Sequence, residues 1–158
     1  AVTERKVQWK KKRHSLKSMV IAKSCKTIIY LSKVVSGSVH DYTLFKNIFD
    51  KNSNYFKDNI VFADLGYQGI ASDYKPEFVV MPVKRKKSDD TSEYYWLKRA
   101  FNKLVSQMRI GIEHAIGGMK KFRLASQTIR IKSCQAVDTI LGVCAGLWNY
   151  SLLSFERD

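Results

Sequence analysis

The sequence contains few of the residues that mark disulfide-rich or proline-rich proteins. Two of its 158 residues are proline and three are cysteine, namely Cys25, Cys134 and Cys144. An odd number of cysteines without Cys-x-x-Cys spacing argues against a disulfide framework and against a zinc site. We predict that Cys134 and Cys144, which lie on or beside a predicted helix, are small core residues.

The sequence also lacks the segments that direct a chain to a membrane or anchor it there. No signal segment is visible, and no uninterrupted apolar run reaches about 18 residues. No repeat or low-complexity tract divides the chain. With 45% hydrophobic residues, a chain of this length can bury a sizeable core. We predict an intracellular protein with no membrane partner and a single domain over residues 1–158.

Acidic residues are scarce as well. The chain has 14 Asp and Glu against 28 Lys and Arg, so its formal net charge is +14. An excess of this size attracts polyanions and makes their binding sensitive to salt. A single basic run is usually only a solvated face, but here three groups share the excess: Lys10, Lys11, Lys12 and Arg13; Lys84, Arg85, Lys86 and Lys87; and Lys120, Lys121, Arg123, Arg130 and Lys132.

Aromatic side chains lie beside several of these cations. Trp9 and the run Tyr94, Tyr95 and Trp96 have the chemistry to stack on bases or ribose. Rings of this kind are more often core residues, and we expect packing for residues 94–96.

The hydrophobic pattern predicts a mixed α/β order. Strands over residues 16–23 and 26–35, joined by a turn at Ser24 and Cys25, predict a hairpin. Further strands are predicted at residues 60–63 and 78–81, and helices at residues 41–49, 93–121 and 137–152.

Residues 109–120, read as one helix, place Arg109, Glu113 and Lys120 on a single stripe. Steps of 4 and 11 residues at about 100° each return to within roughly 40° of the start. The apolar residues of this region gather beside that stripe and predict a buried face: Leu97, Phe101, Leu104, Met108, Ile112, Ala115 and Met119. Glu113 would then lie at the border of a packed face between two cations, which suits a metal-binding carboxylate. The simpler alternative is an exposed, salt-bridged helix.

A second acid, Asp64, follows the short apolar run at residues 60–63. The next residues include Gly66, Tyr67 and Gly69, which predicts a buried strand that stops and turns. An Asp at the carboxyl end of such a strand faces a crevice where ligands bind in open α/β sheets. As an alternative, Asp64 only caps the turn.

Three blocks of this chain together resemble DDE-type transposases of bacterial insertion sequences and the related Harbinger-type endonucleases. The blocks are residues 37–46, which include His40 and Asp41; residues 63–69 around Asp64; and residues 109–123 around Glu113. They occur in the family order, and the resemblance runs from about Thr3 to the C-terminal helix. It implies a ribonuclease-H-like α/β fold, in which a mixed sheet is flanked by helices.

The resemblance also implies an activity. In the family, two Asp and one Glu bind two Mg²⁺ (or Mn²⁺) that cut and join transposon DNA. Asp64 corresponds to the second acid and Glu113 to the third, in a pattern of Tyr, two residues, Arg, three residues, Glu, six residues and Lys. Arg109 and Lys120 match its Arg and Lys. The implied partner is DNA, contacted by Arg109, Lys120, Lys121, Arg123 and the run Lys10, Lys11, Lys12 and Arg13, and a homo-oligomer is left open. The implied location is the nucleoid-containing cytoplasm of a bacterium or the nucleus of a eukaryote.

Two departures from the family pattern count against activity. Ser106 stands where the pattern has Tyr, and Ala1 stands where the family's first acid precedes a Thr-Glu pair, here Thr3 and Glu4. Residues 4–13 then read as a connecting stretch that is shorter than the family's. We therefore predict an incomplete first strand and a truncated or inactive transposase domain, in which metal is held weakly or not at all.

Two residues could replace the missing acid. Asp41 lies beside His40 at a loop-to-helix junction, but capping of the helix by Asp41 or His40 explains this position more simply. Glu4 is the other candidate. The alternative function is a non-catalytic nucleic-acid-binding module that uses the same scaffold and its charge alone.

Overall fold

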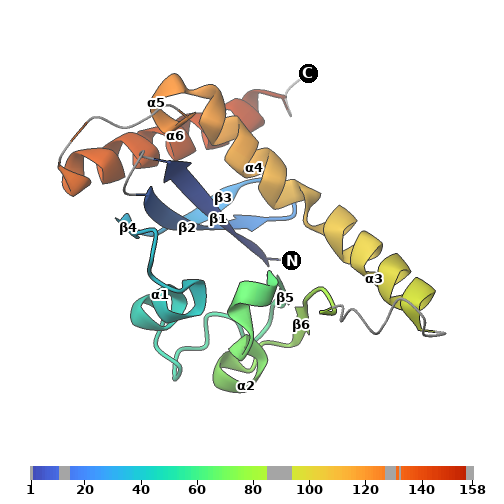
Figure 1. Ribbon diagram of the computed structural model, residues 1–158. Coiled ribbons are helices and arrows are strands. Elements are labelled where there is room, and N and C mark those ends of the chain that lie inside the picture. The colour runs from blue at the N-terminus through green and yellow to red at the C-terminus, as the bar shows by residue number, and fades with distance from the viewer. Residues whose placement is uncertain (1, 11–14, 85–93, 127–130, 132, 156–158) are drawn as a thin grey trace.

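The computed structural model describes residues 2–10, 15–84, 94–126, 131 and 133–155, and for residues 2–10 and 155 it describes the backbone alone. The strands are β1 (Val2–Lys10), β2 (Ser15–Lys23), β3 (Ile28–Leu31), β4 (Val35–Ser36), β5 (Ile60–Phe62) and β6 (Phe78–Val80). The helices are α1 (Asp41–Ile48), the short 3₁₀ helix η1 (Leu65–Tyr67), α2 (Ile70–Tyr74), α3 (Tyr95–Met108), α4 (Ile110–Lys121), α5 (Arg123–Ser126) and α6 (Cys134–Phe155). Figure 1 shows their arrangement around one sheet.

The sheet has the order β3-β2-β1-β5-β6, and β4 pairs with β2. The pairs β1–β2 and β2–β3 are antiparallel, whereas β1–β5 and β5–β6 are parallel. The mixed α/β prediction is confirmed. The predicted connection over residues 4–13 is wrong for residues 4–10, which belong to β1. Four of the nine residues of β1 are charged, and its pairing with both β2 and β5 overrides that composition.

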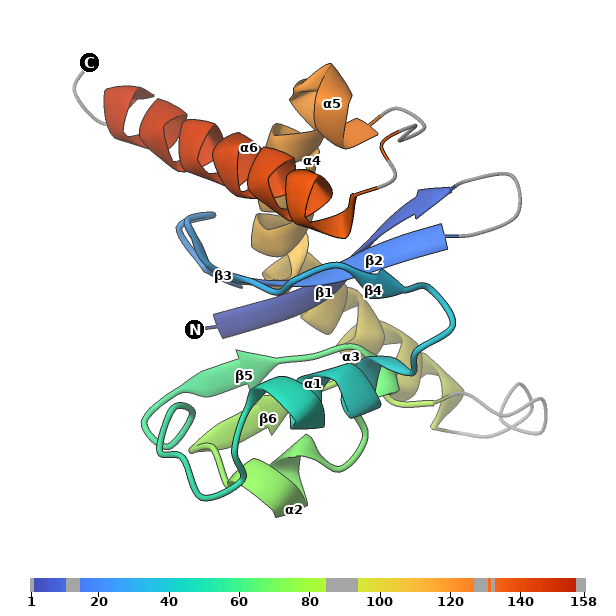
Figure 2. The ribbon, with the colours of Figure 1, turned by 90° about the vertical axis from the view of Figure 1, so that its left-hand side faces the viewer.

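Two hydrophobic clusters cover the two faces of the sheet. Alternate residues of β2 point to opposite faces, so Val20 and Ala22 join one cluster and Met19 and Ile21 the other. Figure 2 shows α4, α5 and α6 on one side of the sheet and α1 on the other. Because both faces of β2 are buried, this strand is the centre of the packing.

The predicted hairpin is present in a shortened form. β2 and β3 are joined by a turn in which the amide of Lys26 donates to the carbonyl of Lys23, at 2.9 Å. Lys26 itself has a φ of +70°, the left-handed conformation that tight turns require. The second predicted strand, residues 26–35, divides into β3 and β4.

Helix α6 closes the first cluster through Val137, Leu141, Cys144 and Ala145. The core prediction is therefore confirmed for Cys144 and wrong for Cys134, which is exposed at the start of the helix. Among the described residues, Cys134–Ser154 alone has the length and composition of a membrane span. This is weak support for such a span, because core helices share that composition.

The predicted helix over residues 93–121 is two helices, α3 and α4, which meet at Arg109. The predicted buried face is correct only for its α4 part: Ile112, Ala115 and Met119 are buried, whereas Leu97, Phe101, Leu104 and Met108 are exposed. Figure 1 shows α3 extending away from the sheet. The periodicity identified the helical region correctly, but α3 extends beyond the body of the protein, so its apolar stripe lies in solvent.

Candidate functional site

Asp64 lies just beyond β5, after Ala63, and begins the turn that forms η1. Its Oδ1 accepts a hydrogen bond from the amide of Leu65 at 2.8 Å, and its main-chain carbonyl accepts one from Tyr67 at 3.0 Å. The side chain caps η1 and keeps half of its surface exposed. The alternative in which Asp64 caps the turn is confirmed. The half-exposed carboxylate is open to solvent, and its binding of a ligand stays a prediction.

Arg109 lies beside Asp64 at the junction of α3 and α4. Its Nη2 is 3.5 Å from Asp64 Oδ2, and its side chain is only 9% exposed. The buried Nε atom has no hydrogen-bond partner within the described structure. A buried guanidinium is stabilised by a nearby carboxylate, so this ion pair brings together two blocks that are far apart in the sequence.

Glu113 lies one helical turn beyond Arg109, in the first turn of α4, and it is exposed. Lys120 follows seven residues later, which is close to two turns, so both side chains lie on the same outer face of α4. Lys120 and Lys121 end α4, Arg123 begins α5, and all three are exposed. The arrangement is an exposed acid followed by exposed cations, beside the helix junction that Arg109 occupies.

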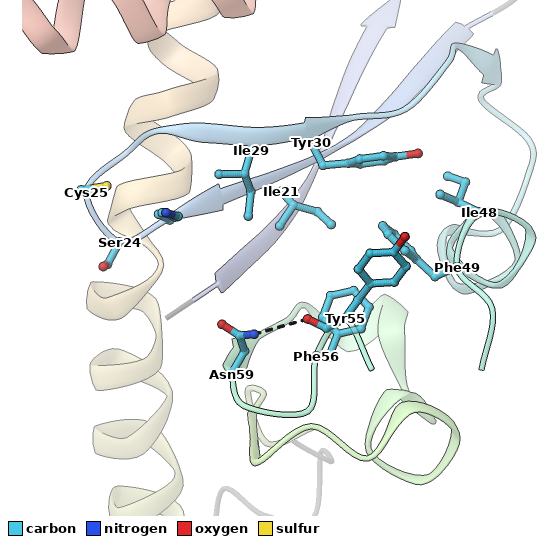
Figure 3. Close-up of a pocket in the computed structure, with 11 residues that line it drawn as sticks. Ile21, Ser24, Cys25, Ile29, Tyr30, Ile48, Phe49, Tyr55, Phe56 and Asn59 are labelled. Atoms are coloured by element: carbon cyan, nitrogen blue, oxygen red, sulfur yellow. Dashed lines mark hydrogen bonds between the residues drawn. The ribbon is translucent and has the colours of Figure 1, made fainter. Parts of the chain in front are cut away.

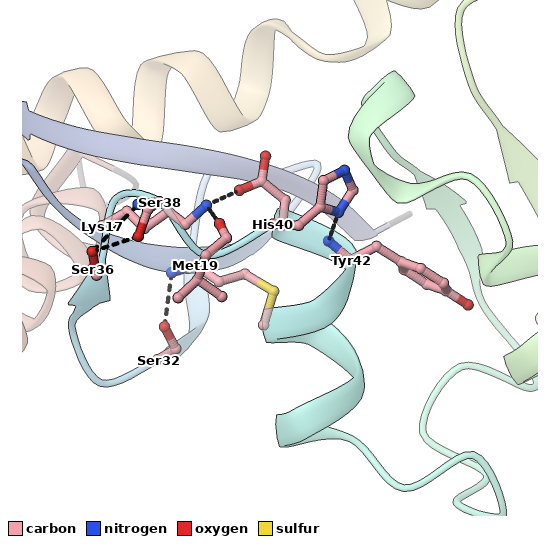
Figure 4. A network of polar contacts seen from close by, with 9 residues as sticks. Lys17, Met19, Ser32, Ser36, Ser38, His40 and Tyr42 are labelled. Atoms are coloured by element: carbon pink, nitrogen blue, oxygen red, sulfur yellow. Dashed lines mark hydrogen bonds and ion pairs between the residues drawn. The ribbon is translucent and has the colours of Figure 1, made fainter.

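The block at residues 40–42 lies against the turn that carries Asp64. His40 caps α1, because its Nδ1 accepts a hydrogen bond from the amide of Tyr42 at 3.3 Å. Asp41 is not the cap: its Oδ1 lies 2.7 Å from the Nζ of Lys17. Lys17 is 2% exposed and also donates to the carbonyl of Val39. Figure 4 shows this network between β2 and the start of α1.

Lys17 is a residue that the sequence reading missed. The available signal was one lysine inside the mostly apolar stretch from Leu16 to Ala22, where Ser18 is the other polar residue. A lysine is almost never fully buried without a partner, so its position in a buried strand predicts a nearby acid.

Asp64 and Glu113 are the two predicted ligands for a divalent cation, and carboxylate oxygens are the ligands that Mg²⁺ prefers. The described residues contain no group of three His, Cys, Asp or Glu side chains placed to hold a metal. Metal binding by Asp64 and Glu113 therefore stays a prediction.

Several predicted DNA contacts cannot be placed. Lys11, Lys12 and Arg13 lie outside the described residues, as do Arg85, Lys86, Lys87, Arg130 and Lys132. Lys10 ends β1, of which the backbone alone is described. The packing prediction for residues 94–96 is wrong for Tyr94 and Trp96, which are 65% and 67% exposed. Trp96 instead lies beside Arg99, whose guanidinium carbon is 5.5 Å from the ring centroid.

An apolar pocket of about 500 Å³ lies at another part of the structure, between the β2–β3 hairpin and residues 55–59 (Figure 3). Its wall includes Ile21, Tyr30 and Phe49, and Cys25 lies at its edge. Burial raises the pKa of the Tyr30 phenol. Because its lining is mostly apolar, this pocket does not suit a phosphate group.

Comparison with known proteins agrees with the arrangement of these blocks. Residues 2–149 match the family described as DDE superfamily endonuclease. Over 140 residues the chain is 31% identical to the probable transposase for insertion sequence element IS702 of Microchaete diplosiphon. That alignment covers 88% of this chain and 47% of the relative, so the chain spans about half of the relative's length. No solved structure matches the chain.

Proposed function

The chain belongs to the DDE superfamily endonucleases, and on this premise we propose that it is a transposase-type domain that binds DNA and cuts it weakly or not at all. The observation that carries the proposal is the 3.5 Å approach of Arg109 to Asp64. It joins the second and third blocks of the family pattern at one place. The net charge of +14 supports DNA as the partner.

We also propose the ribonuclease-H-like fold for this chain, as one domain over residues 1–158. Three antiparallel strands, followed by parallel strands β5 and β6 beside β1, support it. Because β1 lies in the middle of this sheet, it links the antiparallel and parallel parts.

In this proposal Asp64 and Glu113 hold Mg²⁺ or Mn²⁺. When bound, the ion would supply Lewis-acid stabilisation of charge on a phosphate. Lys120, Lys121 and Arg123 contact the DNA backbone from the exposed face of α4 and the start of α5. The run from Lys10 to Arg13 does so from the β1–β2 connection. Association into a homo-oligomer and a location with the DNA of the cell stay predictions.

Arg109 has a different role in this proposal from that of the other cations. Since its side chain is buried and directed to Asp64, it orients this carboxylate. A direct contact of Arg109 with DNA remains a prediction that requires part of the guanidinium to face the bound phosphate.

The weak or absent cleavage rests on residue 1. Ala1 stands where the family has its first acid, so the chain offers a methyl group in place of a carboxylate ligand. Losing one of three carboxylates lowers the affinity for two hard cations, which depend on anionic oxygen ligands.

A metal titration tests the binding part of the proposal. Mn²⁺ or Mg²⁺ is expected to raise the melting temperature, and Asp64→Ala or Glu113→Gln is expected to remove the rise. Asp50→Ala, which changes an exposed acid elsewhere, is the matched control. If Asp50→Ala also removes the rise in melting temperature, or if the unaltered chain shows no rise, the proposed metal site is refuted. Only charge-driven DNA binding would then remain.

A nicking assay on supercoiled plasmid tests the cleavage part. The unaltered chain is expected to leave the plasmid intact with Mn²⁺, and Ala1→Asp is expected to nick it. The double variant Ala1→Asp with Asp64→Ala should again be silent. Cleavage by the unaltered chain would refute the inference of lost activity.

A further inference from the structure

The start of α1 contacts the turn from Asp64 to Gly69 through successive side chains. Asp41 Oδ2 lies 3.3 Å from the position that a Cβ would take on Gly66. The ring of Tyr42 lies 3.1 Å from the corresponding position on Gly69. Phe45 meets the buried ring of Tyr67 edge to face, with 6.0 Å between centroids.

These approaches explain why two glycines occur in the turn. Gly69 has a φ of +108°, which side chains rarely adopt, and the Tyr42 ring also occupies the space beside it. At Gly66, the Asp41 carboxylate alone restricts a side chain. The turn is therefore fitted to α1 at two points, one carboxylate and one ring.

Asp41 is held in turn from the opposite side. Its Oδ1 accepts from the buried ammonium of Lys17, which lies on β2, the strand buried on both faces of the sheet. A buried lysine beside a carboxylate is fixed in position, because both charges lose stabilisation when they separate. The Asp41 carboxylate thus connects the rigid sheet, through Lys17, to the turn at Gly66.

We infer that Lys17 and Asp41 are a positioning pair, which sets the conformation of the Asp64–Gly69 turn and so directs the Asp64 carboxylate toward Arg109. Asp41 acts through this turn and is not the substitute for the family's missing acid. The consequence for metal binding rests on the proposed function, whereas the positioning of the turn does not depend on it.

The test compares two variants that both remove the ion pair. Lys17→Met with Asp41→Asn keeps a planar polar group over Gly66, whereas Lys17→Met with Asp41→Ala removes it. The readout is the amide signal and hydrogen exchange of Leu65 and Tyr67, which donate to Asp64. We expect both double variants to shift the two signals and to speed the exchange, the Ala variant at least tenfold and the Asn variant by less, because its planar group still lies over Gly66 but is no longer held by the ammonium. An Asn variant identical to the unaltered chain would show that Lys17 has no part in the positioning.

Ile112→Val is the control for lost stability, because Ile112 is fully buried in the cluster on the other face of the sheet. It lowers the melting temperature without touching the turn. If exchange at Leu65 and Tyr67 changes as much in Ile112→Val as in the Ala variant, at equal melting temperature, the positioning role is refuted.

A second variant keeps the inference testable if the Ala variant does not fold. Gly66→Ala places a methyl group 3.3 Å from Asp41 Oδ2. We expect it to shift the Leu65 and Tyr67 signals in the unaltered background, and less in the Lys17→Met, Asp41→Asn background, where the side chain is no longer held by an ammonium. Equal shifts in both backgrounds would show that the pair does not hold the carboxylate in place.

Broadening of the amide NMR signals by paramagnetic Mn²⁺ separates this inference from the proposed function. If Asp41 were a ligand, Asp41→Asn with Lys17→Met would abolish broadening at Leu65; we expect the broadening to persist. No broadening in the unaltered chain would refute the metal site at Asp64 and leave the positioning result, which is measured without metal, unaffected.

Discussion

The guanidinium of Arg109 lies 3.5 Å from the carboxylate of Asp64, and the two side chains differ sharply in exposure, at 9% and 50%. The arginine is therefore the fixed partner, and the carboxylate is the group that a ligand from solvent meets first. Arg109 lies where α3 ends and α4 begins, and its side chain reaches the turn that follows β5.

The Arg109–Asp64 pair should contribute little to stability by itself. We expect a double-mutant cycle of Arg109→Met and Asp64→Asn to give a coupling below about 1 kcal/mol, because half of the Asp64 side chain is in water. The coupling should fall further in about 1 M salt, where the screening length is near 3 Å. Urea unfolding of the four proteins at low and high salt measures it, and a coupling that salt leaves unchanged would contradict the exposed geometry.

Adjacent glycines of α4 should respond to alanine with opposite signs. A Cβ on Gly118 would lie 2.1 Å from the Trp148 ring, whereas nothing lies within 4 Å of a Cβ on Gly117. We expect Gly118→Ala to destabilise the protein by about 1–3 kcal/mol through overpacking. Gly117→Ala should stabilise it by about 0.5–1 kcal/mol through helix propensity. Thermal unfolding of both variants decides this, and Trp148→Leu should relieve part of the Gly118→Ala loss.

The two parts of the helical region should differ in sensitivity to truncation. Ile112 in α4 is fully buried, and Leu104 in α3 is 56% exposed. We expect Ile112→Ala to cost about 2–5 kcal/mol of unfolding free energy. Leu104→Ala should change it by no more than about 0.5 kcal/mol. Equal losses in urea unfolding would indicate that α3 packs on the body of the protein.

The Tyr42–Asp73 hydrogen bond predicts a pH effect. The Tyr42 hydroxyl donates to Asp73 Oδ2 at 2.5 Å, and this bond, followed by Lys51, lowers the pKa of Asp73. Because the pKa of Asp73 is lower in the folded protein than its unfolded value of about 3.9, the ionised carboxylate stabilises the fold at pH values above the unfolded pKa. This stabilisation is lost as the pH falls through the folded-state pKa. We expect Tyr42→Phe to raise the pKa of Asp73 and to destabilise the protein more at pH 6 than below pH 3.

A carbon NMR titration of Asp73 measures that change directly. Tyr55→Phe is the control, because Tyr55 is 70% exposed and its ring packs on Phe49 rather than near Asp73. An unmoved Asp73 titration in Tyr42→Phe would show that the hydrogen bond does not hold the carboxylate.

Two cysteines should react at different rates. A hydrogen bond from Thr27 lowers the pKa of the exposed Cys25 thiol, whereas burial raises the pKa of Cys144. Since the thiolate is the nucleophile, we expect iodoacetamide to modify Cys25 well before Cys144 at pH 7.5. Thr27→Val should slow the modification of Cys25, and the modification rate of the exposed Cys134 reports whether reagent access has changed. Peptide mass spectrometry over time measures all three.

Local patterns predicted much of the fold. The helix at residues 41–49, the strands before Asp64 and at residues 78–81, and the hairpin all follow from short-range periodicity and turn residues, and each is present. β1 was not predictable in this way, because charged residues dominate it and its partners lie elsewhere in the chain. Nor was the exposure of Phe101, since a regular apolar stripe does not reveal whether anything packs against it.

In the candidate site too, local sequence patterns predicted some residues and could not predict others. The blocks around Asp64 and Arg109 could be selected from the sequence, but their contact joins residues far apart in the chain and is seen only in the structure. The partner of Asp41 could not be selected, because nothing local to residues 40–42 indicates a lysine in β2. Site residues that act through tertiary contacts need coordinates to be recognised.

The parallel pairing of β1 with β5 has a consequence for the order of folding. Nine register pairs join β1 to β2 across a short connection, whereas only Val2 and Thr3 pair with β5, at Val61 and Phe62. Pairing Thr3 with Phe62 closes a loop far longer than the connection between β1 and β2, so it costs more chain entropy than closing the hairpin. We therefore expect the β1–β2 hairpin to form early and β5, which Asp64 closely follows, to join it late. The candidate site is then assembled only when the last long-range contacts are made.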